Sequence, residues 1–132
     1  MNYYTSKEQS KKLLELGLNP NTADMFLASD VVICEPYITK TEFETLTPAY
    51  KGAIPCWSLG ALLQVIPPIT KHGMFGDEVC LPTLTKGVDE NQWHCIYRSY
   101  GISITVSHWY DNPLDAVYDT VTWLLEKGYI NK

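Results

Sequence analysis

Residues 92–128 read QWHCIYRSYGISITVSHWYDNPLDAVYDTVTWLLEKG, and this stretch decides the fold. Up to Trp109, apolar and polar residues alternate with a period of two, which is typical of strands. Asn112 and Pro113 then favour a helix start, because Asn accepts first-turn amide hydrogen bonds and Pro suits the first helical position. Apolar residues recur every three or four positions from there until Gly128. We therefore expect two strands followed by a helix that packs across them.

A further strand is expected upstream of this stretch. Residues 79–85 also alternate, so residues 79–85, 92–98 and 102–109 together predict a three-stranded antiparallel meander. Pro82 cannot donate a backbone hydrogen bond, which places the first of these strands at an edge of the sheet.

The loop between the last two strands leaves their register open. A two-residue loop, Tyr100-Gly101, gives these opposite pairs: Tyr97 and Ile104, Cys95 and Val106, Trp93 and His108. A three-residue loop shifts the register by one residue and brings His94 and Ile96 to the apolar face instead.

The N-terminal half is expected to be largely helical. Ser6 and Gln9 form a capping-box pattern, so a first helix of about three turns starts there. Thr22 favours a second, short helix, and the two helices would form an αα-hairpin. Residues 58–66 form a strongly apolar segment that the following prolines stop, and we expect it to be a buried central helix.

Residues 29–53 carry only weak strand signals, and within them residues 31–34 and 38–46 are expected to be strands or extended loop. Helices segregated from a run of strands are typical of the α+β class. A chain of 132 residues is close to the usual size of one domain, so residues 1–132 are expected to form a single domain. The expected fold is a three-stranded antiparallel meander packed by a C-terminal helix, with an N-terminal αα-hairpin and a buried central helix.

Composition and charge narrow the classes of function. With 45% hydrophobic residues the chain reads as globular. No apolar run approaches the ~20 residues of a membrane span, and the N-terminus lacks a signal-peptide pattern, so we expect a cytoplasmic protein that does not contact a membrane. The net charge is −5, and the only basic group is Lys7, Lys11 and Lys12, so no nucleic-acid partner is expected.

The four cysteines, Cys34, Cys56, Cys80 and Cys95, have spacings unlike those of a disulfide scaffold or a zinc site. We expect them to be buried and reduced, and we expect no metal and no cofactor. Cys95 and His108 lie one cross-strand step apart in the first register. They are weak candidates for a catalytic nucleophile and its base.

Aromatic residues at termini, turns and loops are candidates for a binding surface. Tyr and Trp bury a large area with little loss of side-chain freedom, which suits them to protein contacts. The candidate contact residues are Tyr3, Tyr4, Tyr100, Trp109 and Tyr110.

Three stretches of the chain resemble a known group of proteins. They are KEQSKKLLELGL (7–18), IPCWSLGALL (54–63) and the pair NPLDAV and WLLEKGYI within 112–130. They resemble small uncharacterised proteins of gut Bacteroidetes genomes and their prophages, for which no activity is known. The resemblance implies an intracellular, mobile-element setting, and it transfers no catalytic residue.

The sequence therefore favours a non-enzymatic accessory or protein-interaction protein whose partner it does not identify. One alternative is a small hydrolase or transferase with an unrecognised site. A second alternative is DNA binding through the N-terminal helices.

Overall fold

The computed structural model describes residues 3–28, 31–33, 54–73, 76–87, 92–99, 101 and 103–130. The helices are α1 (Lys7–Glu15), α3 (Leu59–Val65) and α4 (Pro113–Lys127), with a 3-10 turn η1 (Pro20–Thr22). The strands are β1 (Met25–Ala28), β2 (Val31–Ile33), β3 (Ile54–Cys56), β4 (Ile69–Gly73), β5 (Gly76–Lys86), β6 (Trp93–Arg98) and β7 (Ser103–Thr105).

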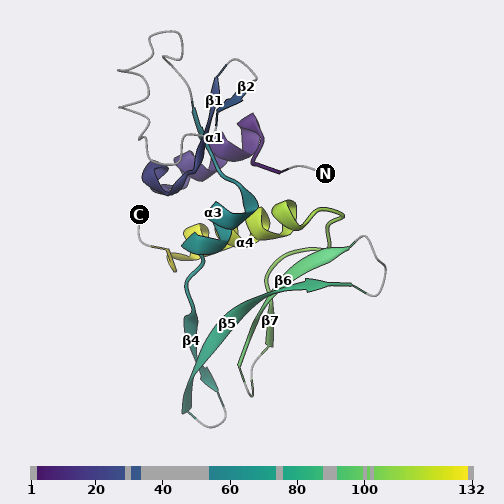
Figure 1. The fold of residues 1–132 in the computed structure, drawn as a ribbon. Helices are drawn as coiled ribbons and strands as arrows, with labels where there is room; N and C mark the ends of the chain where they lie inside the picture. The colour runs from purple at the N-terminus through teal and green to yellow at the C-terminus, as the bar shows by residue number, and fades with distance from the viewer. Residues whose placement is uncertain are drawn as a thin grey trace.

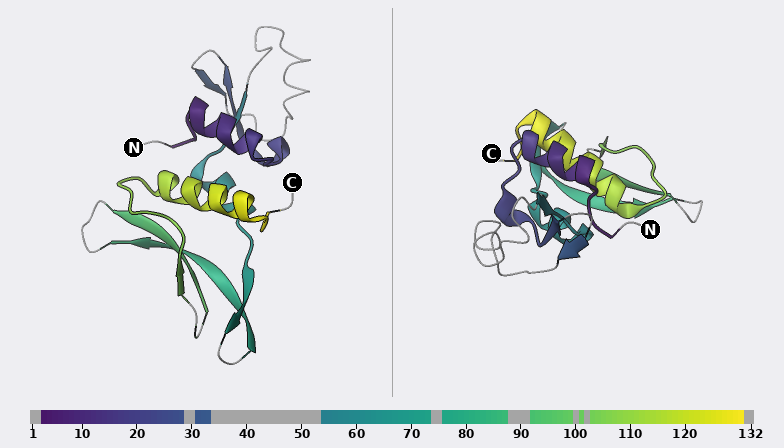
Figure 2. Two further views of the ribbon diagram at one scale, coloured as in Figure 1. Left: turned by 180° about the vertical axis from the view of Figure 1, so that it is seen from behind. Right: turned by 90° about the horizontal axis from the view of Figure 1, so that it is seen from above.

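The described residues form an α+β fold with two antiparallel sheets, in agreement with the expected class (Figure 1). One sheet has the strand order β2-β1-β3, and the other has the order β4-β5-β6-β7. Figure 2 shows α4 between the two parts, with α1 and the small sheet on one side and the four-stranded sheet on the other. The side chain of Gln9 on α1 donates to Asp115 on α4 at 2.9 Å, which ties the first turns of the two helices together.

The expected αα-hairpin is wrong. Its first helix, α1, begins with the capping box of Ser6 and Gln9. The second segment instead forms the single turn η1, whose chain is extended again at Ala23, and then the strand β1. A four-residue apolar run fits a helix or a strand equally well by pattern. Pairing of β1 with β2 and β3 decides in favour of the strand.

The central helix α3 is buried on one side only, so the expectation of a buried central helix holds in part. Ala61 and Leu62 are buried, whereas Leu63 is 43% exposed. The most extensively buried helix is α4, in which eight residues are buried. The boundaries of α3 are close to those expected, because Ser58 caps its first turn and prolines follow its end.

The predicted meander corresponds to β5, β6 and β7, although β7 covers only residues 103–105 of the expected 102–109, and a fourth strand, β4, extends the sheet. In the strand order β5 lies between β4 and β6, but among the described residues Pro82 is paired on the β6 side alone, in agreement with the expected edge position. The two halves of β5 have different partners, since residues 76–80 pair with β4 and residues 81–86 pair with β6. Continuing the β4 register would bring Pro67 opposite Pro82, and neither residue has an N–H group to donate. The β4 ladder accordingly ends at the Ile69–Cys80 pair.

The register of β6 and β7 follows the first of the two alternatives, with Tyr97 opposite Ile104. It changes at Cys95, whose carbonyl accepts hydrogen bonds from the N–H groups of two consecutive residues, 106 and 107. Beyond this bulge, Trp93 pairs with Tyr110. The expected pairing of Trp93 with residue 108 is therefore wrong, because a bulge adds residues to one strand only.

Helix α4 covers one face of the four-stranded sheet and contacts β5 and β6. Cys95 belongs to a core cluster with Leu114 and Val117, and Tyr97 packs in a neighbouring cluster with Leu124. Because side chains alternate along a strand, the next residues on β6 face away from α4. The outer face of the sheet is the one that α4 does not cover, although two residues on its β6 part, His94 and Ile96, are buried.

Candidate functional site: the open face and free edge of the sheet

The candidate catalytic pair of Cys95 and His108 does not form a described contact. Cys95 is 3% exposed within the core. Burial raises the pKa of its thiol, an effect that a hydrogen bond with Thr120 reduces and that Asp119 reinforces. His108 is exposed, and its backbone N–H donates to the Asp119 carboxylate at 3.1 Å. The thiol is thus held in its protonated form inside the core.

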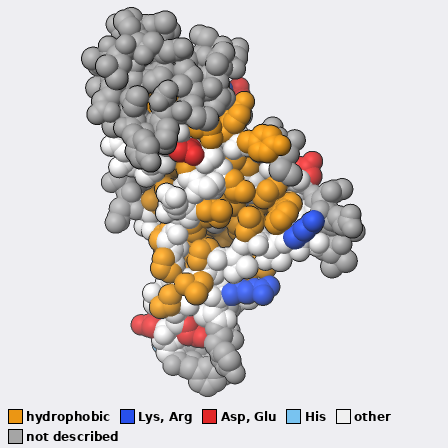
Figure 3. All heavy atoms as spheres, in the orientation of Figure 1, with side chains coloured by type: hydrophobic (Ala, Val, Ile, Leu, Met, Phe, Trp, Pro, Cys, Tyr) orange, Lys and Arg blue, Asp and Glu red, His pale blue; other side chains and the backbone are white. Residues whose placement is uncertain are grey.

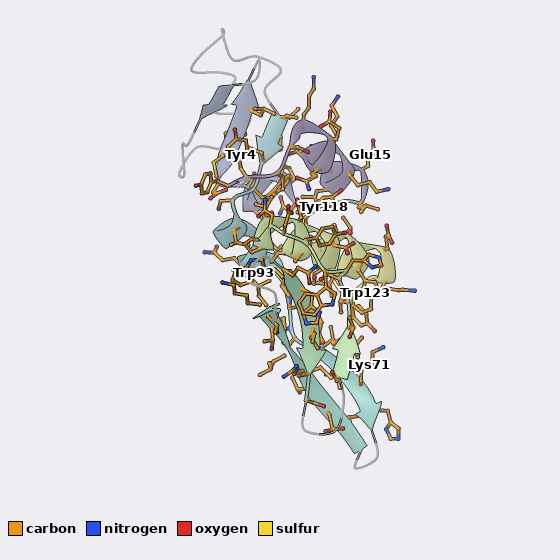
Figure 4. All side chains as sticks on the ribbon, turned by 90° about the vertical axis from the view of Figure 1, so that its right-hand side faces the viewer. Tyr4, Glu15, Lys71, Trp93, Tyr118 and Trp123 are labelled. Carbon is orange, nitrogen blue, oxygen red and sulfur yellow. The ribbon has the colours of Figure 1, made fainter. Side chains whose placement is uncertain are left out.

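Two candidate contact residues precede α1. Tyr3 is 73% exposed, whereas Tyr4 is half-buried and forms an isolated bridge with Ser58. Figure 4 shows Tyr4 and Trp93 on the same side of the molecule, above and below the start of α4.

Two further candidates precede α4. Trp109 is 47% exposed. Tyr110 is half-buried, and its hydroxyl donates to the Asp119 carboxylate at 3.2 Å. Tyr100 lies outside the described residues. Tyr3 and Trp109 are therefore the exposed aromatic residues of the candidate set among those described.

Cys80 is buried and free, like Cys95, Cys56 is also buried, and Cys34 lies outside the described residues. In the described part of the chain, His, Cys, Asp and Glu side chains nowhere gather in threes or more as metal ligands would.

A cavity of about 430 Å³ lies beside the start of α3. The Asp24 carboxylate on its wall accepts from the backbone N–H of Ser58 at 2.9 Å and from the Ser58 hydroxyl at 2.5 Å. The same hydroxyl accepts from the N–H of Ala61 and so caps α3. Thr22, also on the wall, accepts from the indole of Trp57. These hydrogen bonds hold β1, η1 and α3 together. The polar groups on the cavity wall therefore have a structural role.

The outer face of the four-stranded sheet, called the open face below, carries Val79, Leu81, Thr83 and Thr85 on β5 and His94, Ile96 and Arg98 on β6. Val79 and Leu81 are 58% and 59% exposed. Two large apolar side chains in line on one strand are unusual on an uncovered surface and suit a contact with another molecule. Figure 3 shows apolar side chains gathered across the middle of one face, with basic side chains beside and below them and acidic ones both above them and toward the lower end.

Trp109 closes one end of the open face. Its ring stacks on the imidazole of His94, with ring centroids 3.7 Å apart and an interplanar angle of 19°. It also lies over Gly87, where an added Cβ would come within 2.7 Å of the indole. Glycine at residue 87 is what allows this close approach.

One side of β5 has no partner strand among the described residues over positions 82–86, and we call this side the free edge. The Gly87 N–H donates to the Gln92 carbonyl at 2.7 Å, which makes these residues a hydrogen-bonded pair. Such pairs alternate along an antiparallel ladder. The N–H of Thr85 therefore points toward β6, and the N–H and C=O groups of Leu84 and Lys86 point outward.

The charge near the free edge differs from that of the whole chain. In residues 81–87 and 92–98 the only Asp, Glu, Lys or Arg side chains are Lys86 and Arg98, and both are exposed. The chain as a whole carries a net charge of −5. Lys86 also lies over the Trp93 ring, with its Nζ 5.7 Å from the ring centroid.

Sequence reasoning placed Pro82 at an edge of the sheet, but it did not indicate how far the free edge extends and it missed the exposure of Val79 and Leu81. The residues from 79 to 82 are all apolar, so the pattern does not say which side chains face the core. Pro82 was the available signal, because proline marks a position where a ladder lacks a donor.

Among the described residues no helix combines the length and the apolar character that a membrane span requires. No protein-family model, curated protein or solved structure matches the chain. The resemblance to proteins of gut Bacteroidetes and their prophages therefore rests on the three sequence stretches alone.

Proposed function

We propose that this protein binds another protein by accepting an extended segment of it along the free edge of β5. The observation that carries the proposal is the outward-pointing N–H and C=O groups of Leu84 and Lys86, on the same strand as the exposed side chains of Val79 and Leu81. An added strand gains main-chain hydrogen bonds, and its alternate side chains reach the open face.

The apolar side chains supply the affinity in this proposal. Complete burial of a Val or Leu side chain contributes about 1.5–3 kcal/mol. Val79 and Leu81 have more than half of their surface still to bury. Each main-chain hydrogen bond adds only about 1 kcal/mol net and chiefly fixes the register of the added strand.

The charges define the partner segment as acidic. Lys86 and Arg98 are exposed cations on this part of the sheet, and complementary charges raise the rate and specificity of association. Pro82 and Lys86 are also the kinds of residue that keep sheet edges from pairing indiscriminately. An extended segment with carboxylates between apolar residues meets both conditions, whereas a second copy of this edge would bring further lysines.

A random decapeptide library displayed on phage tests the proposal, because it samples partner segments of any sequence. We expect selected peptides to alternate apolar and acidic residues. Their affinity should fall about tenfold or more, equivalent to about 1.4 kcal/mol, with Lys86→Pro or Leu81→Asp. Lys86→Pro removes an outward N–H group and a cation and leaves the hydrogen bonds to β6 in place.

Lys11→Glu, on the exposed face of α1, is the control and should leave peptide affinity unchanged. Circular dichroism checks that each variant is folded. Selected peptides whose affinity is the same in folded Lys86→Pro and Leu81→Asp variants would exclude the free edge as the site.

The alternative functions lack a comparable observation. A hydrolase or transferase using Cys95 needs an accessible thiolate, whereas this thiol is buried and has a raised pKa. DNA binding through the N-terminal helices needs a second helix after the turn, and β1 occupies that position. A gel shift with duplex DNA that Lys11→Glu and Lys12→Glu abolish would overturn the protein-binding proposal in favour of α1.

A further inference from the structure

The segment that carries Trp109 covers part of the open face. Residues 106–109, here named the cover segment, leave the ladder at the bulge and rejoin it where Tyr110 pairs with Trp93. The Ser107 hydroxyl accepts from the Cys95 N–H at 2.8 Å and anchors one end of the segment. Toward the other end, before the Tyr110–Trp93 pair, the Trp109 ring lies on His94 and Gly87.

The group beneath Trp109 is a buried histidine with an unpaired ring nitrogen. His94 is 7% exposed, and its Nδ1 has no hydrogen-bond partner among the described residues. A neutral imidazole can leave one nitrogen as an unpaired acceptor. A protonated imidazole donates from both nitrogens, so it would place a charge and an unpaired N–H in the same buried position.

Among the described residues, no group is shown to compensate for a positive charge on His94. Arg98, two rungs along the same face of β6, is the charged group that acts on it, and its charge has the same sign. β5 contributes Thr85 opposite His94, and the cover segment contributes Trp109 and the titratable His108, which is exposed. Burial and then Arg98 lower the pKa of His94 from its ordinary value of 6.5.

The Trp109 ring partly opposes the effects of burial and Arg98, because an aromatic ring face favours a positive charge on His94. A cation stacked on an aromatic ring is attracted to the ring face, most strongly when the pair is desolvated. Burial of an unpaired charge costs more free energy than this attraction supplies. The balance disfavours a protonated His94 beneath Trp109, and hydration of the ring removes the conflict.

We propose that the cover segment is a pH-sensitive latch, in which protonation of His94 releases Trp109 from the open face. In the latched form Trp109 lies on His94, and in the released form it does not. His94 binds the proton more weakly in the latched form than in the released form. The latched form is therefore fully favoured above the pKa of the released form, near 6.5, and loses that advantage as pH falls toward the lower pKa of the latched form. The inference does not depend on the proposed peptide binding, because it concerns the free protein.

Two-dimensional NMR of the Trp109 indole between pH 8 and pH 5 tests the latch. We expect the indole signal to move toward that of an exposed Trp, with a midpoint below 6.5 that matches the titration of the His94 ring. The transition should be absent in His94→Gln and should remain in His108→Gln, which removes the neighbouring exposed histidine. A transition retained in His94→Gln, or an unmoved indole while His94 titrates, overturns the proposal.

Gly87→Ala provides a second test of the latch, which remains valid even if the His94→Gln variant does not fold. The added Cβ would lie 2.7 Å from the indole and should displace it. The displaced ring leaves His94 hydrated, so the midpoint of the His94 titration should rise toward 6.5. An unchanged midpoint in Gly87→Ala contradicts the coupling between Trp109 and His94.

Discussion

Contacts between single residues on the open face affect stability, and single substitutions can measure these effects. Gly87 and Trp109 illustrate this, since the indole occupies the space into which any side chain at residue 87 would project. The cover segment is therefore positioned by a missing Cβ as much as by the stacking on His94.

We expect Gly87→Ala to lower the free energy of unfolding by about 1 kcal/mol or more, because overpacking forces neighbouring groups to move. Gly60→Ala is the matched control. The added Cβ at residue 60 would meet nothing closer than the Ser58 hydroxyl at 3.8 Å, and Ala favours helix α3 by up to about 1 kcal/mol. Urea unfolding curves compare the two variants. Equal stabilities for both would mean that Trp109 does not lie on Gly87.

The thiols provide a second residue-scale prediction. Cys56, Cys80 and Cys95 are buried, so they should react with a thiol reagent only when the protein unfolds. A Cys34→Ser variant removes the contribution of the cysteine outside the described residues. In that variant we expect slow release in the native state and complete release in denaturant. A fast native reaction that Cys95→Ser abolishes would instead favour the enzyme hypothesis.

Elements whose signals are local could be predicted from the sequence, and those that depend on distant partners could not. The caps at Ser6 and Asn112 are formed by neighbouring residues, and both helices start there. Strand β1 could not be told from a helix, because its identity depends on β3, about thirty residues away in the chain. The bulge after β7 depends on the hydroxyl of Ser107 bonding across to β6, which alternation does not reveal.

At the element scale, α4 should be essential for stability because it packs between the two sheets. Leu124→Ala and Val121→Ala remove side chains that are fully buried, and each should cost about 2 kcal/mol or more. Glu126→Ala, on the exposed side of the same helix, should change stability by less than about 0.5 kcal/mol. Denaturant curves in which the core variants lose under half of the expected value would place α4 outside the core.

For the whole molecule, the α+β class and the acidic charge could be read from the sequence, whereas the candidate site could be read only in part. Trp109 was a candidate contact residue from its position before a helix, and it is exposed. Pro82 indicated an edge, but the extent of the free edge could not be predicted, because it exists only where β4 stops pairing with β5. That point is set by Pro67 and Pro82 coming opposite each other, fifteen residues apart in the sequence.

The central claim is that the side of β5 over residues 82–86 is free in the protein alone and paired in its complex. Amide hydrogen exchange measured by NMR tests both halves of the claim. In the free protein the amides of Leu84 and Lys86 should exchange rapidly, while those of Thr83 and Thr85, which point toward β6, should be protected.

Addition of a peptide selected from the display library should slow exchange at Leu84 and Lys86 by about tenfold or more, with little change at Thr83 and Thr85. Strong protection of Leu84 and Lys86 in the free protein would contradict the free edge. Saturating peptide that leaves both amides exchanging rapidly would contradict strand addition at this site.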